Sequence, residues 1–142
     1  MRDALRIELG DWVAMEQRAA PVRFAVFVEE QKVPAEMELD EFDPVCVHAL
    51  AVDADGKVLG TGRLLPDGHI GRMAVLREAR GTGVGSALLR ALMQAARRRG
   101  DRAVVLSAQT HAIPFYRRFG FVAEGDDYDD AGIPHRQMRL EF

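Results

Sequence analysis

The chain has 142 residues, of which 48% are hydrophobic and 29% are charged, and its formal net charge is -3. This length fits one domain with a sizeable core, and the charge argues against a general nucleic-acid-binding protein. No apolar run approaches the roughly 18 residues that span a bilayer. The N-terminus lacks the apolar core of a signal peptide, so we expect a cytoplasmic protein that binds neither membranes nor nucleic acid.

The N-terminal part of the chain predicts a strand, a long helix and a polar connector. Residues 4–9 are typical of a short strand, and residues 11–31 have helical spacing with Asp11 as the expected N-cap. Because proline lacks an N–H and clashes with the preceding turn, Pro21 predicts a split or kink in this helix. Residues 32–44 are acidic and hold prolines near both ends, so we expect a loop or a short helix on the surface.

Three β-rich runs follow, at residues 45–52, 57–65 and 69–76. The turn signals DADG and PDG separate them, so the three strands are expected to pair antiparallel. The only cysteine, Cys46, lies in the first run. A single cysteine excludes an internal disulfide and a cysteine-based zinc site, and its apolar surroundings favour a buried, inert thiol over a nucleophile.

The next helix and strand predict a parallel crossover. Residues 84–99 place apolar side chains on one helical face, and three arginines in the last turn precede Gly100, the expected C-cap. Residues 103–108 predict a continuous apolar strand. Because a helix crosses between this strand and the one before it, the two strands should run parallel.

The chain closes with a short helix and a strand pair. Residues 110–120 predict the helix, and Pro114 inside it indicates a distorted or late start. Residues 121–125 and 135–142 predict the two strands. The acidic residues 126–134 between them predict a loop.

The stretch RGTGVG, residues 80–85, is the strongest functional signal, and it lies between a predicted strand and a predicted helix. Its glycines let backbone amides turn toward an anion and let a ligand approach closely. The new helix adds unpaired amides and a partial positive charge. Since Arg80 adds a full charge, the loop predicts a pyrophosphate site.

Several kinds of loop share this character. A nucleoside triphosphate loop has the pattern GxxxxGK[ST], but here there is no lysine and Ser86 follows Gly85 directly. A dinucleotide loop has the pattern GxGxxG after the first strand of a parallel sheet, with an acidic residue about 20 positions on. The glycines here are residues 81, 83 and 85 and follow an antiparallel meander. A connector without a ligand is disfavoured by the chain entropy that three alternating glycines cost.

The same residues resemble the R/Q-x-x-G-x-G/A signature of the GNAT superfamily, the CoA-dependent N-acetyltransferases, with Arg80, Gly83 and Gly85 at the signature positions. MAV before the loop and SAQTHAIPFYRRFGF after it are similar to that family's strand 4 and second cofactor motif. VFVEEQKVP, MELDEFD and LSAQTHAIPFYRRFGF further resemble the ElaA-like subgroup. The resemblance covers almost the whole chain and implies one N-acetyltransferase domain over residues 1–142.

The resemblance implies an α+β fold whose mixed, mostly antiparallel central sheet is splayed between strands 4 and 5 and flanked by helices. It implies acetyl-CoA as the co-substrate and no metal. The pantetheine arm would lie in the splay, bonded by backbone groups of Met73, Ala74 and Val75 and by Gln109, which stands where many relatives have asparagine. The pyrophosphate would lie on the loop, whose matching residues are Arg80, Gly81, Thr82, Gly83, Val84, Gly85 and Ser86.

Acyl transfer to an amine needs a base, a stabilised oxyanion and a proton donor for the leaving thiolate. Tyr116 matches the family's tyrosine in the second motif, which implies the donor role, with a lining aromatic as the alternative. For the base, Glu30 matches the family region that lines the acceptor pocket, and His111 begins the helix that carries Tyr116. Glu29 and Glu41 are further candidates for the base, and each of these four groups has a solvated surface position as its alternative.

The predicted function is transfer of an acetyl or acyl group from acetyl-CoA to a primary amine of a small molecule or peptide. An inactive CoA-binding sensor or partner module would keep the same loop and is the alternative. The acidic stretches EMELDEFD and EGDDYDD would attract a cationic amine if both flanked the acceptor mouth, although two solvated loops explain them equally well. Dimers are common in the family, so a homodimer is a further expectation.

Overall fold

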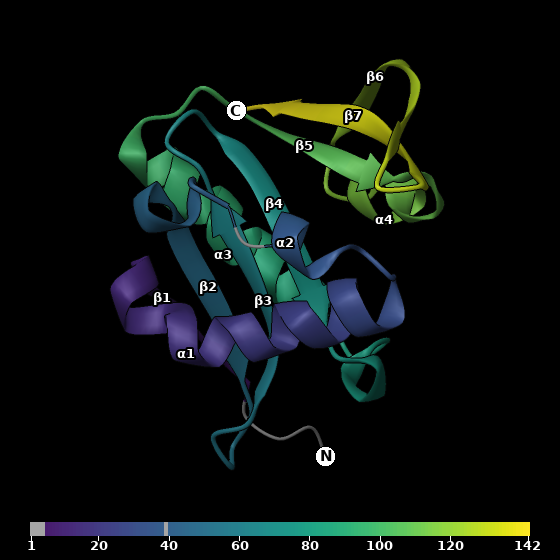
Figure 1. Cartoon of the computed structure of the whole chain (residues 1–142). Coiled ribbons are helices and arrows are strands. Elements are labelled where there is room, and N and C mark those ends of the chain that lie inside the picture. The colour runs from purple at the N-terminus through teal and green to yellow at the C-terminus, as the bar shows by residue number, and fades with distance from the viewer. Residues whose placement is uncertain (1–4, 39) are drawn as a thin grey trace.

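Seven strands form one mixed sheet in the computed structural model, which describes residues 5–38 and 40–142 (Figure 1). The strand order is β1-β2-β3-β4-β5-β7-β6, in which β4 and β5 run parallel and the other neighbours antiparallel. The strands are β1 (Arg6–Gly10), β2 (Val47–Val52), β3 (Val58–Leu64), β4 (His69–Val75), β5 (Ala103–Gln109), β6 (Val122–Asp130) and β7 (Ile133–Glu141). The α+β class, the meander and the parallel crossover are confirmed.

Helices cover both faces of the sheet. They are α1 (Trp12–Arg23), the π-helix η1 (Phe24–Glu30), α2 (Ala35–Glu38), η2 (Asp43–Val45), η3 (Arg77–Ala79), α3 (Val84–Arg99), η4 (Thr110–Ala112) and α4 (Ile113–Arg117). In Figure 1, α1 lies in front of the sheet and α3 behind it. Among the described residues, no helix combines the length and the apolar character needed to cross a membrane.

Alternation along β2 explains how one strand serves two core layers, because successive side chains point to opposite faces of a sheet. Ala49 and Ala51 belong to the core cluster that contains the buried leucines of α3. Leu50 and Val52 belong to the cluster that contains Met15 of α1. The sheet is therefore buried on both faces at its centre, which makes it a rigid support for the site at its splayed edge.

Glycine in β3 lets α3 lie close to the sheet. A Cβ at Gly60 would lie 2.9 Å from Cδ1 of Leu88 and 3.0 Å from both the Ala74 carbonyl oxygen and Cγ1 of Val84. Any larger residue would push the start of α3 away from β4. The glycine loop is therefore held at a fixed distance from the strand that precedes it.

The parallel contact between β4 and β5 is short, and the two strands then separate. Beyond it, β5 pairs with β7 as far as Gln109, and β4 stays on β3 as far as Val75. The paired residues of β4 and β5 are His69 with Val105 and Ile70 with Leu106. The predicted splay between strands 4 and 5 is confirmed.

A bulge in β4 marks the point of separation. The register with β3 shifts between Thr61 and Arg63, and Arg72 has a φ of 48°. A positive φ is unusual for a residue with a side chain and often occurs at functional sites. The bulge directs the Arg72 side chain to the small cavity described below.

The long N-terminal helix is not split at Pro21 but changes its hydrogen bonding after it. Asp11 caps the helix as predicted, accepting a 2.9 Å hydrogen bond from the Ala14 amide. The π-helix begins three residues beyond Pro21, and at its end the Gln31 amide donates to the Val26 carbonyl five residues back, at 3.0 Å. Because proline cannot donate to the ladder, it loosens the turn in which this rearrangement begins.

The expected acidic loop at residues 126–134 is mostly strand, so this prediction is wrong. β6 continues to Asp130, and Ala131 and Gly132, both with positive φ, make a tight turn into β7. Aspartates disfavour strands in general, but β6 is the edge strand of the sheet. Charged side chains are common on such edges because they discourage pairing with other chains.

The acidic connector is helical in two places, α2 and η2, but the expectation that it lies on the surface fails for two of its side chains. Glu38 is 4% exposed and Asp43 is 1% exposed. Buried carboxylates need partners, because an isolated charge is expensive to remove from water. Their partners are arginines, described with the site.

Candidate active site

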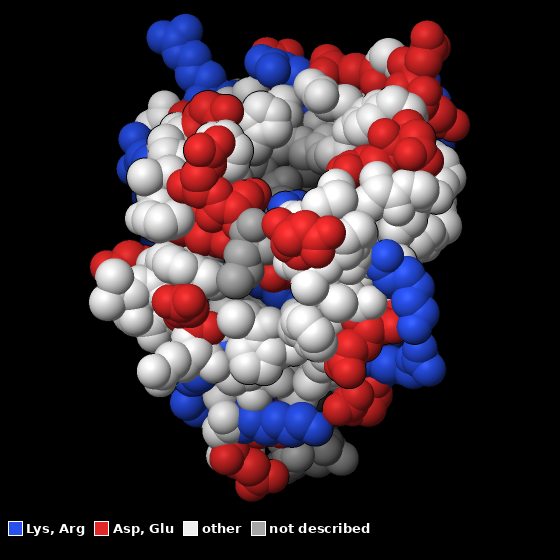
Figure 2. Space-filling model, viewed as in Figure 1, with Lys and Arg blue, Asp and Glu red and all other residues white. Residues whose placement is uncertain are grey.

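The opening between β4 and β5 is a central cleft of about 700 Å³. A loop-side cavity of about 630 Å³ and a small cavity of about 170 Å³ adjoin it. Tyr116 borders both the cleft and the loop-side cavity, whereas Gln109 and His135 border both the cleft and the small cavity. Figure 2 shows this face hollowed, with acidic side chains on both sides of the hollow. The three spaces follow one another along the splay.

The loop-side cavity brings together most of the predicted phosphate-binding residues. Gly81 and Gly83 have φ values of 79° and 91°, a left-handed conformation that glycine adopts without strain. Gly83 precedes α3 as its N-cap and offers no side chain to the first-turn amides. Those amides and the helix dipole therefore favour an anion. The predicted residues that line this cavity are Met73, Val75, Arg80, Gly81, Gly83, Gly85 and Ser86.

Arg90 and Arg118 also line the loop-side cavity, and sequence reasoning did not single them out. Arg90 is held over the ring of Phe119, 5.2 Å from its centroid, by a cation–π contact. No aspartate or glutamate is among the described residues that line this cavity. With Arg80, the cavity presents three arginines, which suits a ligand with several phosphate groups.

Thr82 and Val84 act on the shape of the loop. The Thr82 hydroxyl donates to the Ala79 carbonyl at 2.5 Å, which fixes the turn before α3. Val84 is 3% exposed and packs in the main core. Neither of these two predicted residues is among those that line the loop-side cavity.

The edge of β4 provides a surface for an extended ligand. Met73, Ala74 and Val75 line the central cleft. In the described part of the chain, β5 pairs with β4 only as far as Ile70, so the edge groups beyond that point have no strand partner. Unpaired strand edges bind extended chains by adding them as a further strand.

Arg80 and Glu30 form an ion pair at the junction of the cleft and the glycine loop. The guanidinium donates from Nη1 and Nη2 to the two carboxylate oxygens at 2.6 and 2.7 Å, and its Nε donates to the Val75 carbonyl at 3.0 Å. The hydrogen bond from Arg80 lowers the pKa of Glu30. Glu30 thus stands beside the phosphate site, and its lone pairs are engaged by Arg80.

Tyr116 lies where the loop-side cavity meets the central cleft. Burial raises the pKa of Tyr116 to about 12, so the phenol keeps its proton at neutral pH. His111 borders the cleft from η4 and is exposed. The two predicted groups therefore face the same cleft, Tyr116 from within and His111 from the rim.

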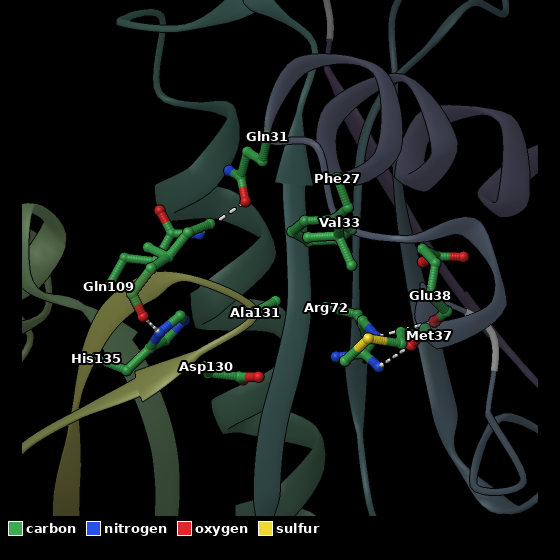
Figure 3. A pocket seen from close by; sticks show the side chains of 11 residues that line it. Phe27, Gln31, Val33, Met37, Glu38, Arg72, Gln109, Asp130, Ala131 and His135 are labelled. Atoms are coloured by element: carbon green, nitrogen blue, oxygen red, sulfur yellow. Dashed lines mark hydrogen bonds between the residues drawn. The ribbon is translucent and has the colours of Figure 1, made fainter.

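Gln109 and Gln31 bridge the cleft. The Gln109 amide donates from Nε2 to Oε1 of Gln31 at 2.8 Å, joining the end of β5 to the end of η1. Figure 3 shows this contact above the small cavity. Gln109 was predicted to contact the cofactor arm, and its partner Gln31 was not singled out from the sequence.

His135 is a titratable group at the site that sequence reasoning missed. It is 9% exposed, borders the cleft and the small cavity, and its Nδ1 lies 2.7 Å from the Ile133 carbonyl oxygen. A carbonyl oxygen only accepts, so Nδ1 carries the proton and Nε2 of the neutral ring keeps a free lone pair. His135 pairs with Gln109 across β5 and β7, a proximity that depends on strand order and has no local signal.

A network of arginines and carboxylates holds the far wall of the site. Arg23, 1% exposed, donates to Glu38 at 2.5 Å and to Asp43 at 2.8 Å. Arg63 donates to Asp43 at 2.7 Å and to both oxygens of Asp40 at 2.7 and 2.8 Å. Glu38, Asp40 and Asp43 of the first acidic stretch are therefore paired within the fold, and Glu36 and Glu41 are its exposed carboxylates.

Arg72 lies at the edge of this network and faces the small cavity. Its Nε donates to the Glu38 carbonyl at 3.1 Å, and its Nη2 donates to the Met37 carbonyl and to Asp40, both at 3.3 Å. Asp40 is closer to Arg63 than to Arg72. The network therefore fixes the position of Arg72 and leaves its charge the least compensated of the three arginines.

An α+β sheet splayed between two parallel strands, with a free strand edge and an arginine-lined glycine loop, defines an acyl-CoA N-acyltransferase. The family model of the acetyltransferase (GNAT) domain matches residues 15–142, and the chain belongs to that family. Members of this family use acetyl-CoA or another acyl-CoA as the co-substrate and transfer the acyl group to an amine.

Known proteins resemble the chain over most of its length. The uncharacterized N-acetyltransferase YjcF of Bacillus subtilis (strain 168) is 43% identical over 121 residues, which cover 82% of this chain and 86% of YjcF. The crystal structure of an acyl-CoA N-acyltransferase from Pseudomonas aeruginosa is 36% identical, with a TM-score of 0.85 over 96% of this chain and 99% of that one. Escherichia coli ElaA is 29% identical, with a TM-score of 0.84 over 97% of this chain and 100% of ElaA.

Proposed function

We propose that this acyltransferase moves an acetyl group from acetyl-CoA to a primary amine of a small molecule or a peptide, by direct transfer. The proposal rests on the order of the three cavities along the opening between β4 and β5. Tyr116 borders both the arginine-lined cavity and the cleft with the free β4 edge. Gln109 and His135 border both that cleft and the small cavity. A long acyl carrier and a small acceptor would thus meet from opposite ends.

The residues of the loop-side cavity fit the phosphate end of coenzyme A. Arg80, Arg90 and Arg118 supply charge, and the first-turn amides of α3 supply directed donors. The backbone of Met73, Ala74 and Val75 would bond the pantetheine arm along the free β4 edge and, with its amides, stabilise the oxyanion. Gln109 would contact the arm from β5. Acetyl-CoA supplies the activated acyl group.

For the proton of the acceptor amine, we favour His135 over Glu30 and His111. Its Nε2 has a free lone pair and borders both the cleft and the small cavity. Glu30 is bonded to Arg80, and the lowered pKa of its carboxyl makes it a weaker base. His111 is exposed at the rim, where water competes for the same role.

Tyr116 would protonate the leaving thiolate. Its raised pKa, about 12, keeps the phenol protonated at neutral pH, and its place at the junction of the cavities supports a position near the thioester. The high pKa also makes the phenol a weak acid, so its contribution depends on proximity to the developing thiolate. The role therefore predicts a loss in kcat with little change in acetyl-CoA affinity.

The test is thiol release from acetyl-CoA with a panel of amines, measured for the wild type, two variants of the proposed catalytic groups and two control variants. Tyr116→Phe should lower kcat by about 100-fold or more and leave the dissociation constant of acetyl-CoA nearly unchanged. Tyr128→Phe, in the other tyrosine of the chain, is the matched control. His135→Gln should remove the acidic-limb dependence of kcat/KM on pH, whereas His69→Gln, on the exposed start of β4, should not.

Binding of acetyl-CoA without turnover across a broad panel would favour the inactive sensor or partner module over the enzyme. An unchanged kcat for Tyr116→Phe would remove Tyr116 from the mechanism. An unchanged pH profile for His135→Gln would return the proton to His111, Glu30 or water.

We also propose that residues 1–142 form one N-acetyltransferase domain, which the pairing of β1 with β2 in the common sheet supports. A cytoplasmic location is supported by the single buried thiol, Cys46, whose pKa is raised by burial. The homodimer stays a prediction, which light scattering on the purified protein would test.

A further inference from the structure

The small cavity differs in character from the rest of the site. Its volume of about 170 Å³ is below the roughly 300–1,000 Å³ of typical drug-sized sites. Phe27, Val33, Met37 and Ile133 give it apolar walls, and its charged lining residues are Arg72, Glu38 and Asp130. The Glu38 carboxylate is paired with Arg23, which leaves Arg72 and Asp130 as the charges available to a ligand. It lies beyond Gln109 and His135 as seen from the loop-side cavity, on the side where the acceptor would enter.

Arg72 and Asp130 lie on opposite sides of the cavity and are not paired with each other. Arg72 comes from the bulge of β4, and Asp130 comes from the end of β6, beside the tight turn. Figure 3 shows both side chains pointing into the space between them. Among the described residues, Asp130 forms no ion pair, and the ion pair of Arg72 is the long contact with Asp40 at 3.3 Å.

One nitrogen of the Arg72 guanidinium, Nη1, is available to a ligand. Its Nε and Nη2 are used by the carbonyls of Met37 and Glu38 and by Asp40. Its Nη1 has no hydrogen-bond partner among the residues that the structure describes, and in Figure 3 it faces the cavity. A guanidinium held by backbone carbonyls on one side presents a fixed donor on the other, which suits a carboxylate oxygen.

We infer that the acceptor is a zwitterion of the amino-acid type, whose carboxylate binds Nη1 of Arg72 and whose ammonium group is attracted by Asp130. This inference rests on the proposed function, since it names the acceptor class of the same site. The single guanidinium of Arg72 favours an acceptor with one carboxylate, and Asp130 repels acceptors that carry additional negative charges. The amine would then lie on the His135 side, where Nε2 accepts its proton before attack.

The apolar wall residues set a second condition. A small cavity lined by Phe27, Val33 and Met37 favours a compact apolar body between the two charged ends. Long polycations such as polyamines have no counterpart to Arg72 and would place a positive charge against it. The geometry therefore favours amino acids over amines that lack an acidic group.

The experiment uses two matched series of acceptors with the full-length wild-type protein. The first series is L-leucine, L-leucinamide and isoamylamine, and the second is γ-aminobutyrate, γ-aminobutyramide and n-propylamine. Thiol release from acetyl-CoA gives kcat/KM for each acceptor. In at least one series the carboxylate member should exceed both neutral counterparts by about tenfold or more, mainly through a lower KM, because charge-assisted hydrogen bonds discriminate strongly.

Variants of Arg72 assign the preference to this side chain. Arg72→Gln should reduce the ratio of kcat/KM between carboxylate and neutral members to within a few-fold, and Arg72→Lys should retain part of it. The ratio is measured within one variant, so a partial loss of folding or of activity cancels from it. Arg98→Gln, an exposed arginine of α3, should keep the wild-type ratio. Asp130→Asn should lower kcat/KM for all members alike.

The outcomes separate this inference from the proposed function. Equal turnover of carboxylate and neutral members, or a preference that survives Arg72→Gln, overturns the zwitterion assignment and leaves the acyltransferase intact. No turnover of any member, with acetyl-CoA still raising the melting temperature, also overturns the acceptor class. Failure of acetyl-CoA to bind at all would instead overturn the proposed function.

Discussion

The two ends of the site are built in different ways. On the phosphate side, half of the lining comes from one continuous stretch, the loop and the first part of α3 from Ala79 to Arg90, and the rest comes from β4 and from the segment between Ala112 and Phe119. On the acceptor side, they come from η1, α2, β4, β5 and the β6–β7 turn, which are far apart in the sequence. Backbone amides and glycine conformations dominate the first, and side chains held by ion pairs dominate the second.

This difference separates what is common to a family from what distinguishes its members. A loop made of backbone groups binds the same phosphate chemistry whatever surrounds it. A pocket assembled from side chains on many elements changes with each substitution. The acyl carrier is therefore encoded locally, and the acceptor is encoded by tertiary structure.

Removing Asp43 should have the largest effect and should act on the acceptor side alone. The Asp43 side chain is 1% exposed and bonds both Arg23 and Arg63. Asp43→Ala leaves these buried guanidiniums short of a partner, which costs about 3–5 kcal/mol of unfolding free energy. Urea denaturation measures this loss, and the KM of the acceptor should rise in the folded variant.

The matched control is Glu41→Ala, an exposed carboxylate of the same acidic stretch. It should change stability by less than about 0.5 kcal/mol. If Asp43→Ala weakened acetyl-CoA binding as much as acceptor binding, the network would couple the two ends of the site. The phosphate side and the acceptor side would then not be independent.

The second largest effect is expected at low pH, where the arginine–carboxylate network on the acceptor side should lose stability. Hydrogen bonding from Arg63 is the main cause that lowers the pKa of Asp40 to about 2. Because the folded pKa lies below the unfolded value, the stabilisation is complete above pH 5 and is lost as the pH falls toward 2. Because the pKa of Asp40 is lower in the folded than in the unfolded chain, its ionised carboxylate contributes about 2 kcal/mol of stability at neutral pH. Unfolding free energies measured by urea titration across this range should show the loss.

Asp40→Asn should be less stable than the wild type near neutral pH and should lose part of the acid dependence. Asp55→Asn, in the exposed turn between β2 and β3, should retain the wild-type dependence. Parallel pH curves for the wild type and Asp40→Asn would show that this carboxylate contributes nothing to acid sensitivity.

The sequence predicted the fold and the position of the glycine loop beside the loop-side cavity, because both depend on local patterns. Period-two and period-3.6 hydrophobicity placed the meander and α3, and the spacing of Gly81, Gly83 and Gly85 placed the loop. The clear miss in secondary structure was β6. Its aspartates predicted a loop. They are tolerated in a strand because β6 lies at an edge of the sheet, and that position depends on the order of all the strands.

The acceptor side was predicted less completely for a related reason. The sequence around Arg72 predicts only a strand residue. Its proposed contact with the acceptor depends on the bulge and on carbonyl groups more than thirty residues away. His135 reaches the cleft only because β7 inserts between β5 and β6. Glu30 lines the central cleft, and its pairing with Arg80 joins residues fifty positions apart. None of these proximities has a local signal.

On the phosphate side, Gly83→Ala should have a moderate effect confined to acetyl-CoA. At a φ of 91°, a residue with a Cβ costs roughly 1–2 kcal/mol, and the strained loop should move its amides away from the phosphates. Isothermal titration should show weaker acetyl-CoA binding, with the acceptor KM nearly unchanged.

Gly56→Ala is the matched control, because Gly56 has a similar φ of 87° but lies in the β2–β3 turn. It should lower stability by a comparable amount and leave acetyl-CoA binding intact. Equal losses of acetyl-CoA affinity in both variants would mean that the effect is one of general stability.

The smallest effect is expected at the junction of the two sides, where Glu30 pairs with Arg80. If the pair competes with the pyrophosphate, Glu30→Gln should free Arg80 and tighten acetyl-CoA binding by roughly two- to fivefold, the size expected for a partly exposed ion pair. If Glu30 is the base, the same change should lower kcat by about 100-fold or more and leave binding alone. Glu29→Gln, the exposed neighbour, should do neither. Because the two roles move different constants, a single titration with a single rate measurement decides whether Glu30 belongs to the phosphate side or to the chemistry.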